Sequence, residues 1–432
     1  MKNLFVSICF LLSASISFAQ QTSPVYEFRG VWIATVDNID WPQKNQFNVD
    51  SQRADFIRQL DLHKANGMNA VVVQVRPATD AFYPSPYEPW SQWLTGTQGK
   101  PPFPFYDPLE FMIAESHKRN LEFHAWLNPY RANFSIGKAS IAPSHITKLH
   151  PEWFLDYGGK TYFDPGNKNG QQWTLNIIED IVKRYDVDAI HMDDYFYPYR
   201  IAGKEFPDAQ SYANDSRGLN REDWRRSNVD TIIYQLSNII KQNKPWIKFG
   251  ISPFGVWRNS DKDAMGSATK AGQTNYDDLY ADILLWLKNG WIDYVAPQLY
   301  WEIGFKLAPY ETLIEWWSKN SYGRHLYIGQ GIYRALARGT SNAAWKNPNE
   351  LPNQIKMLRS YSNVHGSIYF SSKSFDSNPN GWVDSLKNNY YSKPALIPVM
   401  EWLPQNPNKK NDTNPTGLLP SATQLPMEKK GD

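Results

Sequence analysis

The chain has 432 residues, and its 45 Lys and Arg residues nearly balance its 43 Asp and Glu residues. That length suits a single α/β barrel of about 350 residues as well as two smaller domains. The balanced charge gives no indication of a nucleic-acid or anionic-membrane partner. Aromatic residues make up 15% of the chain, with 18 Trp, 25 Tyr and 21 Phe. Besides core packing, such an excess suits stacking against the apolar faces of sugar rings.

Residues 1–19 have the pattern of a secretory signal peptide. An apolar run follows Lys2, and the small residues Ser17 and Ala19 precede the expected cleavage site. The only cysteine, Cys9, lies inside this segment, so we expect a mature chain that is stable without disulfides. The pattern predicts export to the periplasm or the medium. No later segment has the length of a membrane span.

Between residues 26 and 395, short β-branched or aromatic runs alternate with helical patterns. Helical periodicity marks 51–67, 107–120, 222–243 and 276–290, and the first and last of these end in Asn-Gly, a helix stop signal. Eight strands that alternate with helices predict an α/β fold, a single (β/α)8 TIM barrel. The expected strands are 28–35, 70–76, 121–129, 189–194, 248–254, 293–301, 325–333 and 366–372.

The last part of the chain, residues 396–432, is expected to be a largely disordered extension. From residue 404 onward it is rich in Pro, Asn, Thr and Lys and shows no sustained period. The stretch 393–404 is expected to pack back on the barrel.

Two adjacent carboxylates, Asp193 and Asp194, end the fourth expected strand. In "AIHMDD", His191 and Asp193 share one face of the strand, and the apolar Met192 shares the other with Asp194. The apolar face of a barrel strand packs against helices, so we expect Asp193 to point toward the barrel axis. Asp194 has the opposite parity, and capping a helix, holding a loop and direct chemistry all remain open for it.

The same alternation places further polar side chains at the carboxyl ends of the strands, where barrel enzymes keep their chemistry. Asp193 and Glu302, at the ends of the fourth and sixth strands, are expected to face each other across the barrel mouth. Arg76 is expected either to lower the pKa of a nearby carboxylate or to form a structural ion pair. The other polar residues of this inward set are Gln74, His124, Trp126, Asn128, His191, Gln298 and Tyr300, of which Gln74, His124 and His191 also fit a buried polar network.

Two carboxylates across a barrel mouth suit glycoside hydrolysis, in which one acts as acid and the other as nucleophile or base. We expect Asp193 to be the nucleophile and Glu302 the acid/base of a retaining reaction, with Asp194 as the alternative partner. Aromatic residues are candidate stacking walls for sugar rings: Tyr195, Phe196, Tyr197 and Tyr199 after the fourth strand, with Trp126, Trp257 and Trp301 elsewhere.

Six blocks in order resemble the glycosyl hydrolase-like 10 family, over Glu27 to Pro404. They are "EFRGVWIATVDNIDWP", "HAWLNPYR", "YDVDAIHMDDYFYP", "DWRRSNVD", "FGISPFGVWRN" and "DYVAPQLYWE". "DAIHMDD" is also similar to the fourth-strand motif of amylase-like barrels, where the aspartate in the place of Asp193 is the nucleophile. The amylase-like acid is a glutamate on strand five, but "GISPFGVWRN" holds no carboxylate. This departure favours Glu302 as the acid.

The resemblance implies a bacterial exported glycosidase that acts on a polysaccharide or an envelope glycan, such as peptidoglycan strands, without a metal or cofactor. The substrate-binding candidates are Arg76, His124, Trp126, Asn128, His191, Tyr195, Tyr197, Trp257, Gln298 and Tyr300. One alternative is a metal-dependent deacetylase, in which His145 and His150 join the Asp193–Asp194 pair. Others are a non-catalytic glycan-binding barrel and an amylase-type enzyme. The sequence indicates no oligomeric state.

Overall fold

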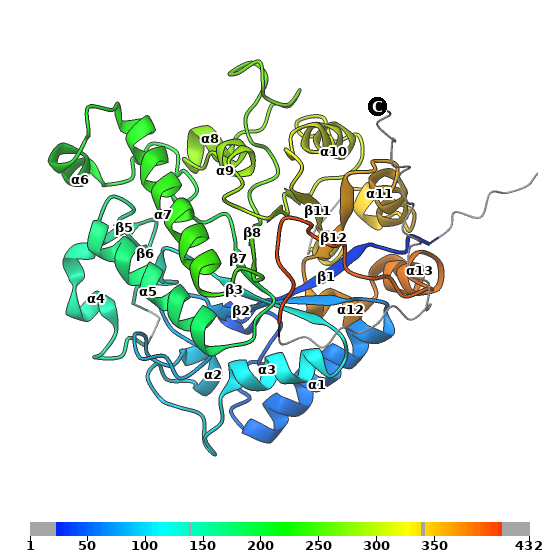
Figure 1. The fold of residues 1–432 in the computed structure, drawn as a ribbon, viewed down its shortest axis with the longest axis horizontal. Coiled ribbons are helices and arrows are strands. Elements are labelled where there is room, and N and C mark those ends of the chain that lie inside the picture. Colours follow the sequence, from blue (N-terminus) through cyan, green and yellow to red (C-terminus); the bar gives the residue numbers. More distant parts are fainter. Residues whose placement is uncertain (1–22, 138–139, 338–341, 408–432) are drawn as a thin grey trace, which may run out of the picture.

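The computed structural model describes residues 23–137, 140–337 and 342–407. The signal-peptide segment 1–19 and the tail beyond residue 407 lie outside these ranges. The predicted TIM barrel is confirmed, because eight parallel strands pair in chain order and the first pairs with the last (Figure 1). The strands are β1 (Phe28–Ile33), β2 (Ala70–Arg76), β3 (Glu122–Leu127), β7 (Ala189–Met192), β8 (Lys248–Ile251), β9 (Tyr294–Val295), β11 (His325–Gln330) and β12 (Val364–Tyr369), and the short β10 (Gln298–Leu299) continues the line of β9.

Helices surround the strands and connect them (Figure 1). The four long helices α1, α3, α5 and α7 each begin after an Asn or Asp whose side chain accepts a hydrogen bond from the first turn. The α-helices are, in chain order, α1 (Val49–Ala65), α2 (Gln92–Thr95), α3 (Pro108–His117), α4 (Ile146–Leu149), α5 (Lys168–Arg184), α6 (Ala209–Asn214), α7 (Arg221–Asn243), α8 (Asn275–Asp278), α9 (Ile283–Lys288), α10 (Tyr310–Lys319), α11 (Glu350–Leu358), α12 (Ser372–Ser377) and α13 (Trp382–Ser385).

The single helix predicted over 276–290 is wrong, because the segment forms α8 and α9 with a break between them. Tyr280 has a left-handed backbone with φ of 51°, which ends the helical path. Its hydroxyl accepts a hydrogen bond from Arg225 at 2.7 Å, and Asp282 then caps α9 by accepting from Leu285. A tertiary contact therefore overrides the local helical pattern.

A small antiparallel sheet follows β3, and the sequence analysis did not predict it. Its strands are β4 (Arg131–Asn133), β5 (Phe154–Tyr157) and β6 (Lys160–Phe163), in the order β4-β6-β5. Each strand is only three or four residues long, so none shows a convincing alternation. This sheet belongs to the connection after the third barrel strand, and it brings Arg131 to the carboxyl end of the barrel.

The barrel interior contains a continuous chain of polar groups. Trp32 donates to His191 Nε2 at 3.3 Å, and His191 Nδ1 lies 2.9 Å from the Tyr294 hydroxyl. The same hydroxyl lies 2.9 Å from His124 Nδ1, and His124 Nε2 lies 3.1 Å from a Glu122 oxygen. Each group has a partner if His191 donates to Tyr294, Tyr294 donates to His124, and His124 donates to Glu122. Burial lowers the pKa of both histidines, which agrees with neutral rings.

The chain enters and leaves the barrel at the amino ends of the strands. Glu27 donates its backbone N–H to the Leu396 carbonyl at 2.9 Å, and Leu396 donates to the Val25 carbonyl at 2.8 Å. Trp402 donates its indole N–H to Asp293, directly before β9, at 2.9 Å. The first and last described segments therefore lie side by side at one end of the molecule.

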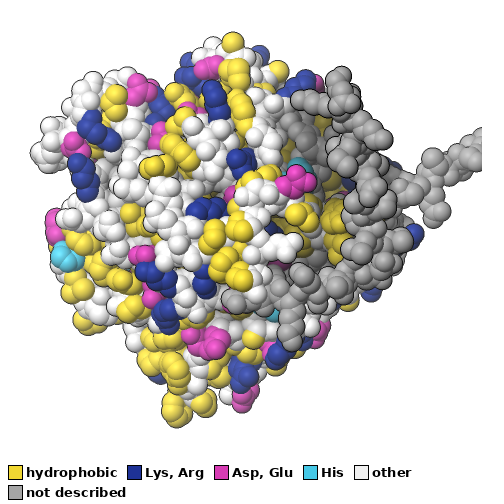
Figure 2. Space-filling model, viewed as in Figure 1, with side chains coloured by type: hydrophobic (Ala, Val, Ile, Leu, Met, Phe, Trp, Pro, Cys, Tyr) yellow, Lys and Arg dark blue, Asp and Glu magenta, His cyan; other side chains and the backbone are white. Residues whose placement is uncertain are grey.

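Charged side chains of both signs are interspersed on the face shown in Figure 2. This distribution agrees with the near balance of acidic and basic residues in the chain. Within the described ranges, no helix combines the length and the apolar character needed to cross a membrane.

The close packing of Gly250 against Tyr294 inside the barrel yields a stability prediction. A Cβ atom added at Gly250 on β8 would lie 2.0 Å from the Tyr294 ring, whereas one at the exposed Gly272 meets nothing within 4 Å. We expect Gly250→Ala to lower the free energy of unfolding by roughly 2–3 kcal/mol, because the ring that bonds both histidines must move. Calorimetric Tm values measure this. Equal Tm values for Gly250→Ala and the control Gly272→Ala would contradict the packing shown here.

Candidate active site

Asp193 lies directly after β7 and points toward the end of β3, as its parity predicts. Its carboxylate accepts hydrogen bonds from Trp126 Nε1 at 3.1 Å and from Asn128 Nδ2 at 3.1 and 3.2 Å. The backbone N–H of Tyr195 approaches it at 3.4 Å. Burial raises the pKa of Asp193, while the positive charge of Arg131 and these donors lower it. The group is buried but well supplied with interactions that stabilise its ionised form.

Asp194 lies beside it and is buried as deeply. The strand ends at Met192, so the alternation no longer holds and Asp194 does not turn outward. Its carboxyl accepts a hydrogen bond from the Tyr199 hydroxyl and also bonds the Gln298 side chain. Burial and the neighbouring charge of Asp193 raise the pKa of Asp194 to about 7. The two carboxyl groups therefore differ in environment: burial raises the pKa of both, Arg131 and the hydrogen-bond donors oppose that rise at Asp193, and the charge of Asp193 adds to it at Asp194.

Aromatic side chains surround the two carboxyl groups. The Tyr195 and Tyr199 rings stack at 5.5 Å, after β7. At the ends of the three strands β10, β11 and β12, the half-buried Tyr300, Tyr333 and Phe370 pack together with ring centres 5.6–6.1 Å apart. Burial raises the pKa of the Tyr300 hydroxyl, and the charge of Asp194 adds to that rise, so Tyr300 belongs to the same site.

The positive charge of Arg131 acts on the Asp193 carboxylate, and the sequence analysis did not predict this residue. We expected Arg76 to lower the pKa of a nearby carboxylate, but the cation that lowers the pKa of Asp193 is Arg131. The arginine ends the block "HAWLNPYR" three residues after Asn128, and Asn128 accepts its backbone N–H at 2.8 Å. That hydrogen-bonded turn returns the chain over the barrel end.

Glu302 lies in the loop after β10, and both of its oxygens are occupied. Asn342 Nδ2 donates to one oxygen at 2.6 Å, and Trp345 Nε1 donates to the other at 3.0 Å. The hydrogen bonds of Glu302 thus connect two loops, and none of its interactions within the described residues reaches Asp193 or Asp194. Its role as the acid stays a prediction.

Arg76 forms a buried ion pair with Glu88 in the loop that follows β2. Its Nη2 and Nε lie 2.6 and 2.8 Å from Glu88 oxygens, and its Nη1 donates to the carbonyl oxygen of Asn128 at 2.5 Å. Both side chains are completely buried. Of the two roles left open for Arg76, the structure shows the ion pair with Glu88. Arg76 also bonds the carbonyl oxygen of Asn128, whose side chain donates to Asp193.

The remaining predicted residues fall into two groups. Trp126, Asn128, Tyr195, Gln298 and Tyr300 meet the carboxyl pair. His124 and His191 instead belong to the buried polar chain beneath it. Tyr197 is 1% exposed and packs against Phe206, Tyr280 and the Arg225 guanidinium, while Trp257 stacks on Trp316 of α10. His124, His191, Tyr197 and Trp257 therefore contribute to the packing around the site and not to the group that contacts the carboxyl pair.

The two histidines of the deacetylase alternative lie apart from the carboxyl pair. His145 is buried and bonds the Thr79 and Thr147 hydroxyls at 2.7 and 2.8 Å. His150 stacks on Trp153. Across residues 23–137, 140–337 and 342–407, no group of three His, Cys, Asp or Glu side chains converges as metal ligands would. This geometry lends no support to a metal-dependent deacetylase.

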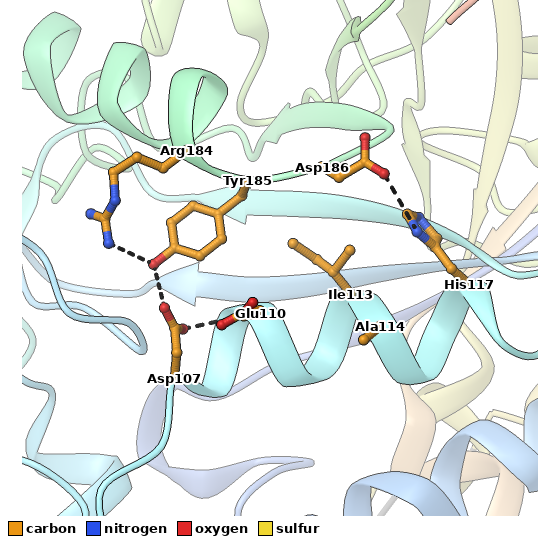
Figure 3. A pocket seen from close by; sticks show the side chains of 8 residues that line it. All are labelled: Asp107, Glu110, Ile113, Ala114, His117, Arg184, Tyr185 and Asp186. Atoms are coloured by element: carbon orange, nitrogen blue, oxygen red, sulfur yellow. Dashed lines mark hydrogen bonds and ion pairs between the residues drawn. The ribbon is translucent and has the colours of Figure 1, made fainter. Parts of the chain in front are cut away.

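A pocket of about 580 Å³ lies on the outer wall of the barrel, between α3 and the end of α5 (Figure 3). Tyr185 donates its hydroxyl to Asp107 at 2.7 Å and accepts from Arg184 at 3.0 Å. The lining contains none of the predicted site residues: it consists of Asp107, Glu110, Ile113, Ala114, His117, Arg184, Tyr185 and Asp186. Because its central polar groups bond one another, we assign it no chemistry.

Comparison with known proteins gives the family. Residues 27–347 match the model described as Glycosyl hydrolase-like 10. The chain is 48% identical to glycosyl hydrolase YngK of Bacillus subtilis (strain 168) over 423 residues, which cover 97% of this chain and 80% of that protein. It is 35% identical to glycosyl hydrolase DigH of Escherichia coli (strain K12) over 364 residues, or 79% of this chain and 82% of that protein.

Solved structures with the same fold are much more distant in sequence. The catalytic domain of β-amylase from Paenibacillus polymyxa matches with a TM-score of 0.55 at 12% identity, over 86% of this chain and 100% of that one. α-L-Fucosidase isoenzyme 2 from Paenibacillus thiaminolyticus matches with a TM-score of 0.50 at 12% identity, over 83% and 49% of the two chains. At this identity the likeness concerns the barrel fold alone.

The buried ion pair of Arg76 yields a second stability prediction. We expect Glu88→Gln to lower the free energy of unfolding by roughly 3–5 kcal/mol, because it leaves the Arg76 charge buried and uncompensated. Glu315→Gln, which breaks the exposed pair with Lys319, is the matched control and should leave the free energy of unfolding nearly unchanged. Tm values measure both effects, and a similar small loss for the two variants would show that the Arg76–Glu88 pair is not structurally important.

The raised pKa of Asp194 predicts a pH-dependent effect on stability. The folded state binds the Asp194 proton more tightly than the unfolded state, whose pKa is near 3.8. The stabilisation that protonated Asp194 gives the folded state is fully present below pH 3.8 and is lost as the pH rises through about 7. Asp194→Asn removes this titration, so the variant should gain roughly 3–4 kcal/mol relative to wild type between pH 4 and pH 8. Tm values at both pH values test this, with Asp261→Asn, at an exposed position, as control; a gain that does not depend on pH would contradict it.

Proposed function

Because the chain belongs to the glycosyl hydrolase-like 10 family, we propose that it is an exported glycoside hydrolase that cleaves O-glycosidic bonds in a polysaccharide or an envelope glycan. Peptidoglycan glycan strands are one substrate of this class. The single observation that carries the catalytic proposal is the buried Asp193–Asp194 pair, whose members have different hydrogen-bond partners. The signal-peptide pattern of residues 1–19 supports export to the periplasm or the medium.

Asp194 takes the role of the general acid. A carboxyl with a pKa of about 7 carries its proton at neutral pH and can transfer it to the glycosidic oxygen. The Tyr199 hydroxyl and the Gln298 side chain hold the orientation of the Asp194 carboxyl. Removal of the proton through the pH range around 7 should therefore lower the rate of bond cleavage.

Asp193 takes the role of the nucleophile. Burial raises the pKa of Asp193, and the charge of Arg131 with the donors Trp126 and Asn128 opposes that rise and favours the carboxylate form. Retaining enzymes hold their two carboxyl groups about 5–5.5 Å apart, and inverting enzymes leave about 6.5–9.5 Å for a water. For Asp193 and Asp194, which are consecutive residues, we propose the shorter spacing and a retaining reaction.

The reaction proceeds in two steps. Asp194 protonates the leaving oxygen while an Asp193 oxygen bonds to the anomeric carbon, and the bond to the leaving sugar breaks. The Asp194 carboxylate then takes a proton from water, whose oxygen displaces Asp193 and restores both groups. Tyr195, Tyr199, Tyr300, Tyr333 and Phe370 provide flat faces against which sugar rings can stack.

Substitution of three carboxylates tests these roles. We expect Asp193→Asn and Asp194→Asn each to lower kcat by about 10²–10⁴-fold, because an amide neither attacks nor donates a proton. Glu302→Gln should retain most of the activity, since Glu302 bonds Asn342 and Trp345. The wild-type kcat should fall as the pH rises above about 7. Purified mature protein is incubated with polysaccharides and peptidoglycan sacculi, and the products are identified by mass spectrometry and proton NMR.

Other outcomes would assign the site differently. If Glu302→Gln loses activity and Asp194→Asn keeps it, then Glu302 is the acid, as the sequence analysis expected. A first product of inverted anomeric configuration contradicts Asp193 as nucleophile. Binding of glycans without any turnover would identify a non-catalytic glycan-binding barrel.

A further inference from the structure

The loop after β7 returns to the carboxyl pair through Tyr199. The Tyr199 hydroxyl donates to the Asp194 carboxyl, and the ring stacks on Tyr195 and meets Phe254 edge-on. Tyr199 is nevertheless 37% exposed, so these contacts leave part of the ring in solvent. The position of its hydroxyl therefore depends on how firmly the backbone of the loop is held.

The two residues after Tyr199 connect this backbone to two other parts of the fold. Arg200 Nε lies 2.6 Å from an oxygen of Asp278, at the end of α8 in the connection after β8. Ile201 donates its backbone N–H to the Tyr157 hydroxyl, on β5 of the small sheet, at 2.8 Å. The segment that carries the tyrosine is thus tied both to the connection after β8 and to the small sheet.

Asp278 is a fixed partner for the arginine. Its side chain is only 4% exposed, and it accepts hydrogen bonds from the backbone N–H and the hydroxyl of Thr274 at 2.5 and 3.2 Å. Burial raises the pKa of Asp278, while the Thr274 bonds and the charge of Arg200 oppose that rise. The neighbouring charge of Asp277 adds to the rise. A surface arginine therefore pairs with a carboxylate that the fold already holds in place.

A purely structural account of this ion pair is that Arg200 compensates the buried charge of Asp278. That account predicts a loss of stability when the pair is broken, and no change at Asp194. The position of the arginine directly after Tyr199 adds a second consequence. A backbone released at residue 200 weakens the hydrogen bond that Tyr199 donates, and this bond favours the ionised form of Asp194.

We propose that Arg200 is a positioning residue, whose ion pair with Asp278 holds the Tyr199 hydroxyl on the Asp194 carboxyl. This inference rests on the proposed function, in which Asp194 is the general acid, and it names what tunes that acid. Burial and the charge of Asp193 raise the pKa of Asp194 to about 7, against the effect of the Tyr199 hydrogen bond. The remaining groups that face Asp194 are Tyr195, Gln298 and Tyr300, with Arg131 acting on Asp193.

Two variants break the ion pair from its opposite ends. Arg200→Met and Asp278→Asn should each raise the pKa of Asp194 by about 0.5–1 pH unit, because each loosens the Tyr199 hydrogen bond. A through-space effect of charge alone gives opposite signs, since loss of the cation raises that pKa and loss of the anion lowers it. The Asp278→Asn variant therefore distinguishes positioning from simple electrostatics.

Two measurements report the pKa of Asp194 in each protein. The difference in Tm between a protein and its Asp194→Asn version changes with pH up to the folded pKa of Asp194 and is constant above it. The fall of kcat with rising pH gives the same pKa during turnover. Both midpoints should move upward in Arg200→Met and Asp278→Asn. Asp277→Asn, which breaks the pair of the adjacent α8 residue with Arg258, is the matched control and should cause no rise.

A double variant shows whether the arginine acts through the tyrosine. Tyr199→Phe removes the hydroxyl and should raise the pKa of Asp194 at least as much as Arg200→Met does. Arg200→Met should then add nothing in the Tyr199→Phe background, because the bond that it loosens is already absent.

An unchanged pKa of Asp194 in Arg200→Met and Asp278→Asn, shifts of opposite sign in the two, or a full Arg200→Met effect in the Tyr199→Phe background would overturn the positioning role. The Tm measurement needs no substrate, so it separates this result from the proposed function. The expected shifts without any turnover would keep the link from Arg200 to Asp194 and remove the hydrolase. Turnover that is lost in Asp194→Asn, with a pH profile unmoved in both ion-pair variants, would do the reverse.

Discussion

The burial of two consecutive carboxyl groups is the constraint on which the site depends. Ionised carboxylates lose their hydration when buried, and two neighbouring ones repel each other. The barrel meets this cost asymmetrically: Asp193 receives two side-chain donors from β3 and the chain after it, together with a nearby positive charge, while Asp194 receives a tyrosine and an amide. The asymmetry gives the two groups different environments, and the proposed two-carboxylate reaction depends on that difference.

The layers beneath the pair explain how these donors are held in place. Trp32, His191, Tyr294 and His124 form one directional series of hydrogen bonds that ends on Glu122, so the polar interior leaves the rings of this series satisfied and neutral. Above this series, Arg76 bonds both Glu88 and the carbonyl of Asn128. The residues that carry the proposed chemistry therefore rest on a rigid set of buried contacts.

The sequence predicted the barrel well because each of its strands contains a short apolar or alternating run, and it predicted the inward direction of Asp193 from parity alone. It failed where tertiary contacts decide. The turn at Tyr280 depends on Arg225, the strands around Arg131 and Lys160 are too short to show a period, and Asp194 lies beyond the last residue of its strand. Parity also does not distinguish a buried interior layer from the carboxyl end of the barrel, so for His124 and His191 the sequence left open both substrate binding and a buried polar network.

The hydrogen bonds of Val25 and Glu27 with Leu396 hold the two ends of the described chain together at the amino ends of the barrel strands. Both ends of the described chain leave from the pole opposite the carboxyl ends of the strands. A polypeptide tether attached at either end would thus hold the molecule with the carboxyl ends of its strands facing outward, and a surface or fusion partner joined there would leave those ends unobstructed. The same adjacency makes the two ends natural points to join, so a circularly permuted chain opened in a distant loop can preserve the entire barrel.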